Sequence, residues 1–186
     1  MSFVIVLLAI PVIALLVFVL IYNALVQARN HCDEAWADID AELKRRYDLI
    51  PNLVRTVQGY AKHEREVLEG VSQARAAAMA NNGSPTSQAR DENQLIRGLR
   101  QLLAVAESYP DLKANKNFLA LQTELANTED RIQRSRRFYN ANVRDYQNRL
   151  QVFPSNLVAG AFNFPPREFF EIEDASEREA PAVQAV

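Results

Sequence analysis

The chain is poor in the residues from which disulfide-rich, zinc-binding and linker-rich proteins are built. Its 186 residues include one cysteine (Cys32), two histidines, five glycines and eight prolines. A single cysteine excludes an intramolecular disulfide and a zinc site made mainly of thiolates. The low glycine and proline content excludes a collagen-like or linker-rich chain. The formal net charge is only −2, so the composition gives no general reason to expect nucleic-acid binding.

Charge is also missing from one end of the chain. Residues 1–28 carry no charged side chain, whereas the other 158 residues carry all 21 Lys and Arg and all 23 Asp and Glu. Residues 2–25 are almost entirely apolar, and a helix of that length rises about 36 Å, enough to cross the ~30 Å hydrocarbon core of a bilayer. Tyr22 suits the membrane interface, and transmembrane helices tolerate a proline such as Pro11. We therefore expect a transmembrane anchor over residues 1–27 that contacts the lipid bilayer through residues 2–25.

A cleaved signal peptide is the main alternative to this anchor. A signal peptide has a basic segment before an apolar run of about 7–15 residues. Here nothing basic precedes the run, and the run is longer, so an uncleaved anchor is favoured, although residues 26–28 could form a cleavage site. Arg29 and the basic residues 44–46 follow the span. The positive-inside rule then predicts an N-terminus outside and the rest of the chain in the cytoplasm, with a periplasmic bundle as the alternative.

The charged part of the chain has the periodicity of amphipathic helices and no alternating strand pattern of useful length. Residues 12–50 lack proline and glycine, and their apolar positions are three and four residues apart, which predicts one helix that leaves the membrane. Pro51 predicts a kink or short break. The apolar stripe resumes after Pro51 and ends at a loop over residues 81–87. A helix that carries Ile96, Leu99, Leu103 and Ala106 follows.

A last and longer helix is expected from Asp111 to Val152, with Pro110 in its first turn and its apolar stripe continuing to Phe153. Three or four helices with narrow apolar stripes must bury them against each other, which predicts an all-α fold: an antiparallel helical bundle over residues 28–171. An aromatic loop is expected to fold back onto this bundle, and it contains Phe162, Phe164, Phe169 and Phe170. Residues 172–186 are predicted to be a disordered acidic tail.

Sequence motifs of catalytic and metal sites are missing or incomplete. His63-Glu64 begins like the zinc-protease motif HExxH, but the fifth position is Val67. Neither histidine follows a glutamate by three residues, as a diiron bundle requires. There is no GxSxG elbow, Walker loop or GxGxxG motif. We therefore expect no catalytic residue, no metal site, no cofactor and no small-molecule substrate.

Acidic residues crowd the first helix beyond the membrane; they are Asp33, Glu34, Asp38, Asp40, Glu42 and Asp48. Paired carboxylates could perform acid–base chemistry, so an accessory hydrolytic enzyme or an envelope-stress sensor that uses this helix is the alternative function. Asp40 and Lys44 are four residues apart, as on a solvated helix surface, which favours a non-catalytic role. The arginines at 134, 136 and 137 are likewise expected on a solvated face rather than in a nucleic-acid site.

Several segments resemble the LemA family in order along the chain. They are residues 22–26, 29–30, 35–36, 39–40, 43–54, 59–60, 63–64, 109–114, 117–118, 121–125, 128–129, 131–132, 137, 139–140 and 153–154. This resemblance implies a bacterial inner-membrane protein with one span, an outward N-terminus and a cytoplasmic helical bundle. It supplies no catalytic residue, and links of relatives to bacterial membrane organelles imply scaffolding at a membrane. His31-Cys32 stands where the family commonly has aliphatic residues.

The expected function is that of a non-enzymatic, membrane-anchored adaptor or scaffold. Its expected partners are the bilayer and either further copies of the chain or other membrane proteins, with no nucleic acid. Confinement to a membrane raises the effective concentration of tethered copies, which favours self-association.

Overall fold

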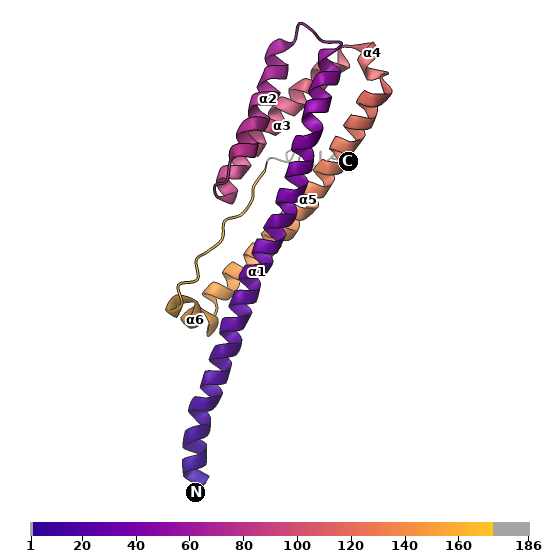
Figure 1. Cartoon of the computed structure of the whole chain (residues 1–186). Coiled ribbons are helices and arrows are strands. Elements are labelled where there is room, and N and C mark those ends of the chain that lie inside the picture. The colour runs from indigo at the N-terminus through magenta and orange to yellow at the C-terminus, as the bar shows by residue number, and fades with distance from the viewer. Residues whose placement is uncertain (1, 173–186) are drawn as a thin grey trace, which may run out of the picture. The chain divides into compact units, whose positions relative to one another are not determined.

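A computed structural model describes residues 2–172, with side chains from Ala9 onward. The described residues form helices and connecting segments without a strand, which confirms the predicted all-α fold (Figure 1). The helices are α1 (Ser2–Gln58), α2 (Arg65–Ala80), α3 (Pro85–Glu107), α4 (Pro110–Lys113), α5 (Lys116–Gln151) and α6 (Ser155–Ala161).

The chain divides into two compact units. Unit 1 comprises Met1–Glu42 and Arg131–Phe169, and unit 2 comprises Leu43–Asp130 and the residues from Phe170 onward. Both α1 and α5 therefore contribute residues to each unit. The predicted domain boundaries at residues 27 and 171 stay predictions. Within the predicted tail Ile172 is buried, and residues 173–186 lie outside the described part.

Helix α1 continues through Pro51 to Gln58. Of the predicted kink or short break, the break is therefore wrong, and the kink stays a prediction. Proline has no N–H to donate to the carbonyl four residues earlier, which belongs to Tyr47. That carbonyl instead accepts a hydrogen bond from Nε of Arg75 on α2, at 2.6 Å. The Arg75 side chain of the neighbouring helix thus satisfies the Tyr47 carbonyl, which has no backbone donor at Pro51, and α1 continues as a helix.

Unit 2 buries one face each of α1, α2, α3 and the first half of α5. Its buried apolar residues include Leu43, Ile50, Leu53, Val57, Leu68, Val71, Leu95, Leu99, Leu102, Leu112, Phe118 and Leu125. Helices α2 and α3 lie side by side (Figure 1). They approach closely at Gly98, where an added Cβ atom would lie 3.3 Å from Cγ2 of Val71. The Ser84 hydroxyl caps α3 by accepting from the backbone N–H of Ser87.

The helix predicted to start at Asp111 is divided in two. Pro110 opens the four-residue α4, and α5 begins only at Lys116. The side-chain oxygen of Asn115 accepts from the backbone N–H groups of Asn117 at 2.9 Å and Phe118 at 3.1 Å. Asparagine is a preferred residue for such a cap, because it satisfies N–H groups that have no partner within the helix. This cap starts a new helix where the sequence pattern suggested continuity.

Unit 1 packs α1 against the second half of α5 and against α6. Its buried residues from the two long helices include Leu25, Cys32, Ala35, Ile39, Ile132, Tyr139, Val143 and Tyr146. The rings of Trp36 and Tyr139 lie 5.2 Å apart, centroid to centroid. At the other end of this unit, Val158 and Ala159 of α6 pack on Leu25 of α1. Phe153, predicted as part of the helical stripe, is 78% exposed, since α5 ends at Gln151.

An extended segment after α6 returns along unit 1, which confirms that the aromatic loop folds back. Three of its carbonyls accept from side chains of α5: Pro165 from the Tyr146 hydroxyl at 2.9 Å, Arg167 from Nε2 of Gln147 at 2.6 Å, and Glu168 from the Tyr139 hydroxyl at 2.8 Å. The Arg167 guanidinium also pairs with Asp33 of α1 at 2.6 Å. The segment is therefore held on unit 1 both by its backbone carbonyls and by the Arg167 side chain.

Candidate functional site

The apolar end of α1 has the properties of a membrane span. Among the described residues α1 is the one helix long and apolar enough to cross a bilayer, with a mean hydropathy of 2.6 over its best 18 residues. Only 6% of that window is buried by the rest of the chain. The exposed large apolar side chains of this stretch run from Ile10 to Leu20. A soluble protein would bury such a surface, so lipid is its natural environment.

The acidic residues of α1 lie where a solvated helix face would place them. Asp33, Glu34, Asp38, Asp40 and Asp48 are exposed, and Glu42 is half-buried. Partial burial raises the pKa of Asp40, and Asp33 is paired with Arg167. None of them lines the grooves of unit 2 described below.

Unit 2 encloses a group of polar side chains that was not expected from the sequence. This group, the Arg46 cluster, consists of Arg46 and Tyr47 on α1, Gln88 and Glu92 on α3, and Glu129 on α5. Arg46 and Glu92 are fully buried. Nη1 of Arg46 donates to both carboxylate oxygens of Glu129, at 2.8 and 3.1 Å, and Nη2 donates to Glu92. One guanidinium thus joins three helices.

The remaining members of the Arg46 cluster complete the hydrogen bonds of Glu92. Its second oxygen accepts from the Tyr47 hydroxyl and from Nε2 of Gln88, the latter at 2.9 Å. Nε2 of Gln88 also lies 3.1 Å from the Tyr47 hydroxyl oxygen and 3.1 Å from the Ala78 carbonyl oxygen, so its two hydrogens are shared among three acceptors. Buried polar groups are tolerated when they are paired in this way.

Arg46 keeps its charge inside this cluster. Burial alone would lower the pKa of its guanidinium, but the carboxylates of Glu129 and Glu92 outweigh that effect, and the pKa is raised above its ordinary value. Glu129 is 31% exposed at its side chain, so one edge of the cluster reaches solvent. The arrangement is an ion-paired network that joins α1, α3 and α5. Both of its carboxylates, those of Glu92 and Glu129, pair with the Arg46 guanidinium.

A faint signal for this cluster exists in the sequence. Arg46 falls at a core position of the α1 stripe, between the buried residues Leu43 and Ile50. Glu92 falls at a core position of α3, between Gln88 and Leu95. A charged residue in register with an apolar stripe indicates a buried pair, whereas the adjacent basic residues 44 and 45 suggested a surface run. Arg136 is a similar case, because it is only 7% exposed and the prediction of a solvated face is wrong for it.

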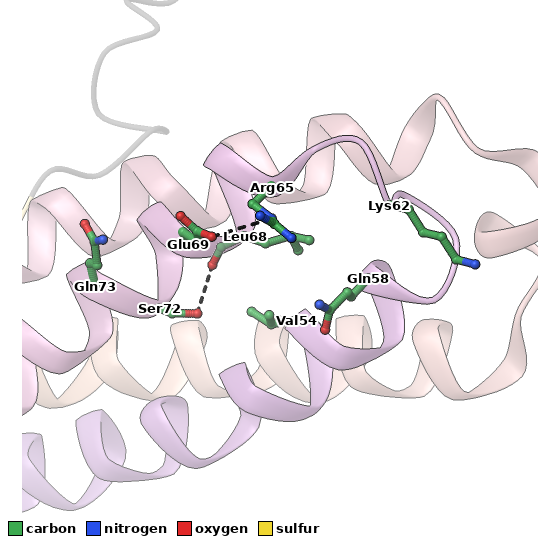
Figure 2. A pocket seen from close by; sticks show the side chains of 8 residues that line it. All are labelled: Val54, Gln58, Lys62, Arg65, Leu68, Glu69, Ser72 and Gln73. Carbon is green, nitrogen blue, oxygen red and sulfur yellow. Dashed lines mark hydrogen bonds and ion pairs between the residues drawn. The ribbon is translucent and has the colours of Figure 1, made fainter.

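Two open grooves lie on unit 2, and some of their polar side chains are paired. The larger, about 900 Å³, lies between the end of α1 and α2 and is lined by Val54, Gln58, Lys62, Arg65, Leu68, Glu69, Ser72 and Gln73 (Figure 2). In it Arg65 faces Glu69 at 3.8 Å, and the Ser72 hydroxyl donates to the Leu68 carbonyl at 2.8 Å. The smaller groove, about 650 Å³, is lined by residues of α1 and α5, including Arg55 and Glu124. The described residues contain no group of three or more His, Cys, Asp or Glu side chains placed to hold a metal ion.

Comparison with known proteins places these features in a family. The LemA family profile matches residues 35–184. The chain is 32% identical to Protein LemA of Metamycoplasma hominis over 139 residues, which are 74% of this chain and 63% of that protein. It is 24% identical to Magnetosome protein MamQ 2 of Paramagnetospirillum magneticum over 181 residues, 84% of this chain and 66% of the relative. A Magnetosome protein MamQ of Magnetospirillum gryphiswaldense is also 24% identical, over 91% of this chain and 73% of the relative.

An apolar helix that continues into a helical bundle with an ion-paired interior defines a membrane-associated, all-α protein. The chain belongs to the LemA family. It spans just under two thirds of the length of the first two of these relatives, 63% and 66%.

Proposed function

We propose that the chain is a non-enzymatic adaptor or scaffold, anchored by one membrane span, whose bundle associates with further copies of itself or with other membrane proteins. The observation that carries this proposal is the continuity of α1. One helix exposes apolar residues at one end and supplies core residues to both units at the other. A helix that continues from the bilayer into a folded bundle holds that bundle at the membrane, as a scaffold requires.

The polar interior of unit 2 also supports a structural role. The charged groups of the Arg46 cluster bind each other, and Arg46 and Glu92 are closed to solvent. A catalytic centre presents its reactive groups to a cavity. The relatives named magnetosome protein support a part in an assembly, and we propose the same kind of role for this chain.

We further propose that the membrane is a bacterial inner membrane and that the bundle lies on its cytoplasmic side. The basic residues Arg29 and Lys44–Arg46 follow the span, whereas no charge precedes it. The positive-inside rule favours this orientation.

A cysteine accessibility experiment tests the orientation. Cys32 itself is unsuitable, because it is buried and burial raises the pKa of its thiol, which leaves less of the reactive thiolate. We expect a cysteine introduced at the exposed Asn82 (N82C) to resist a membrane-impermeant maleimide in intact cells and to react once the inner membrane is permeabilised. Labelling of N82C with the inner membrane still intact would place the bundle on the outer side. The unmodified chain is the matched control for labelling at Cys32.

Association is tested by crosslinking between two differently tagged copies expressed together. Phe138 in unit 1 and Leu119 in unit 2 are exposed apolar residues of α5, at 59% and 45%, and an unpaired apolar surface favours protein contacts. A photoreactive residue at these positions is expected to produce a product that contains both tags, or a defined adduct with one membrane protein. A photoreactive residue at the exposed Asn127 is the control. A chain that runs only as a monomer in detergent, and forms no adduct from either position, would contradict the scaffold proposal.

A further inference from the structure

The segment around α6 lacks charge and exposes large apolar side chains. Residues 150–166 contain no charged residue, and they form the longest such run after Arg29. Within this run Phe153 is 78% exposed, Leu157 63% and Phe162 51%. Single exposed apolar residues are ordinary on a soluble surface. Three large ones within one uncharged segment, named the apolar patch here, instead require an explanation.

Contacts with α1 show where along that helix the segment around α6 lies. The Phe162 ring lies 4.9 Å from that of Tyr22 and 5.7 Å from that of Phe18, measured between centroids. Val158 and Ala159 of the same segment pack on Leu25. Phe18 belongs to the exposed apolar stretch of α1, so Phe162 lies at the end of that stretch nearer the bundle. Figure 1 shows α6 beside α1.

The surroundings of the patch suit a membrane interface. Aromatic rings gather at that level, since Phe164 lies 5.7 Å from Tyr22. The Arg29 guanidinium lies 5.6 Å from the Phe164 ring centroid, where a cation is within reach of lipid phosphates. Interfaces favour aromatic side chains and basic residues in this combination. The Phe162 end of the apolar patch thus adjoins the lipid-facing surface of α1.

We propose that α6 and Phe162 form a second contact with the bilayer, in which Phe153, Leu157 and Phe162 enter the lipid interface beside the α1 span. This inference rests on the membrane anchoring of the proposed function. The second contact has a mechanical consequence. Without it, α1 alone would contact lipid. With it, two adjoining elements contact lipid, and together they resist tilting and rotation of unit 1 at the membrane. The partner that covers this patch is phospholipid, because Phe162 adjoins the span itself.

Tryptophan quenching by brominated lipids measures this contact in the full-length chain. Trp36→Phe removes the single tryptophan, and three further variants each return one: Phe18→Trp in the span, Phe162→Trp in the patch, and Phe138→Trp as the matched control. Phe138 is 59% exposed, yet its neighbour Tyr139 packs on Trp36, about 21 Å along α1 from Tyr22. The chains are reconstituted in phosphatidylcholine vesicles brominated close to the headgroup.

The expected result is strong quenching of both F18W and F162W, several-fold greater than that of F138W. Quenching of F18W with F162W as weak as F138W would overturn the second contact and leave the anchor in place. Loss of quenching at F18W itself would overturn the anchor, and the inference with it. Leu157→Trp repeats the measurement at a second position of the patch, in case F162W lowers the helical content seen by circular dichroism. If a second copy of the chain covered the patch instead, both F162W and L157W would stay unquenched in lipid.

Discussion

Replacing Arg46 by methionine is expected to lower the free energy of unfolding by about 3–5 kcal/mol, the usual cost of removing one partner of a buried ion pair. The change removes the guanidinium that donates to the carboxylates of Glu92 and Glu129. Glu92 would then remain fully buried near the Glu129 carboxylate and would lose its cationic donor, although Tyr47 and Gln88 still donate to it. Methionine keeps the length of the side chain, so the loss reports the charge rather than a cavity.

Urea unfolding of the detergent-solubilised chain, followed by far-UV circular dichroism, measures this loss. Lys44→Met is the matched control, because Lys44 is exposed two residues away on the same helix, and surface changes usually stay within about 0.5 kcal/mol. Adding Glu92→Gln to R46M should restore part of the stability, since the unpaired charge is removed. Equal unfolding midpoints for R46M and K44M would show that the Arg46 cluster does not hold unit 2 together.

The class of fold could be predicted because it depends on patterns along the chain. The uncharged first 28 residues predicted the span, and apolar spacings of three and four predicted α1, α3 and α5. The end of α5 was placed within one residue, at Gln151 instead of Val152, because proline follows closely at Pro154. Such features are local, so they can be recognised without knowing what packs against them.

The interior of unit 2 could not be predicted, because its chemistry depends on pairing across helices. Arg46 is 46 residues from Glu92 and 83 residues from Glu129. Nothing local to Arg46 distinguishes it from its exposed neighbour Arg45 except its register with Leu43 and Ile50. That register indicates that Arg46 is buried, but it does not identify Glu92 and Glu129 as the partner carboxylates.

In the aromatic loop one feature could be predicted from the sequence and another could not. Its return onto unit 1 was predicted from its apolar composition. The exposure of each ring could not be predicted. Phe170 is fully buried, Phe164 and Phe169 are half-buried, and of the four rings only that of Phe162 is exposed. Of these four rings, that of Phe162 is therefore the one most open to a surface contact. Carbonyl hydrogen bonds to α5 settle these positions, and backbone contacts leave no signature in the side-chain sequence.

The continuity of α1 at Pro51 leads to a second large effect, a coupling between two residues on different helices. Arg75→Met is expected to lower the free energy of unfolding by about 1–3 kcal/mol, because the Tyr47 carbonyl loses its donor in a buried place. Arg75 donates to that carbonyl through Nε at 2.6 Å. Methionine retains most of the apolar stem, which limits the loss of packing.

In a chain that carries Pro51→Ala, the same Arg75→Met change should cost much less. Alanine restores a backbone N–H, which can donate to the Tyr47 carbonyl as in an ordinary helix. The four chains of this double-mutant cycle, unfolded in urea, should therefore give a coupling of about 1–2 kcal/mol, within the range found for residues that share a partner. Arg100→Met, at an exposed arginine of α3, is the control and should cost the same with either residue at position 51. If R75M is equally costly with proline and with alanine at that position, the arginine contributes only packing, and another explanation is needed for the unbroken helix.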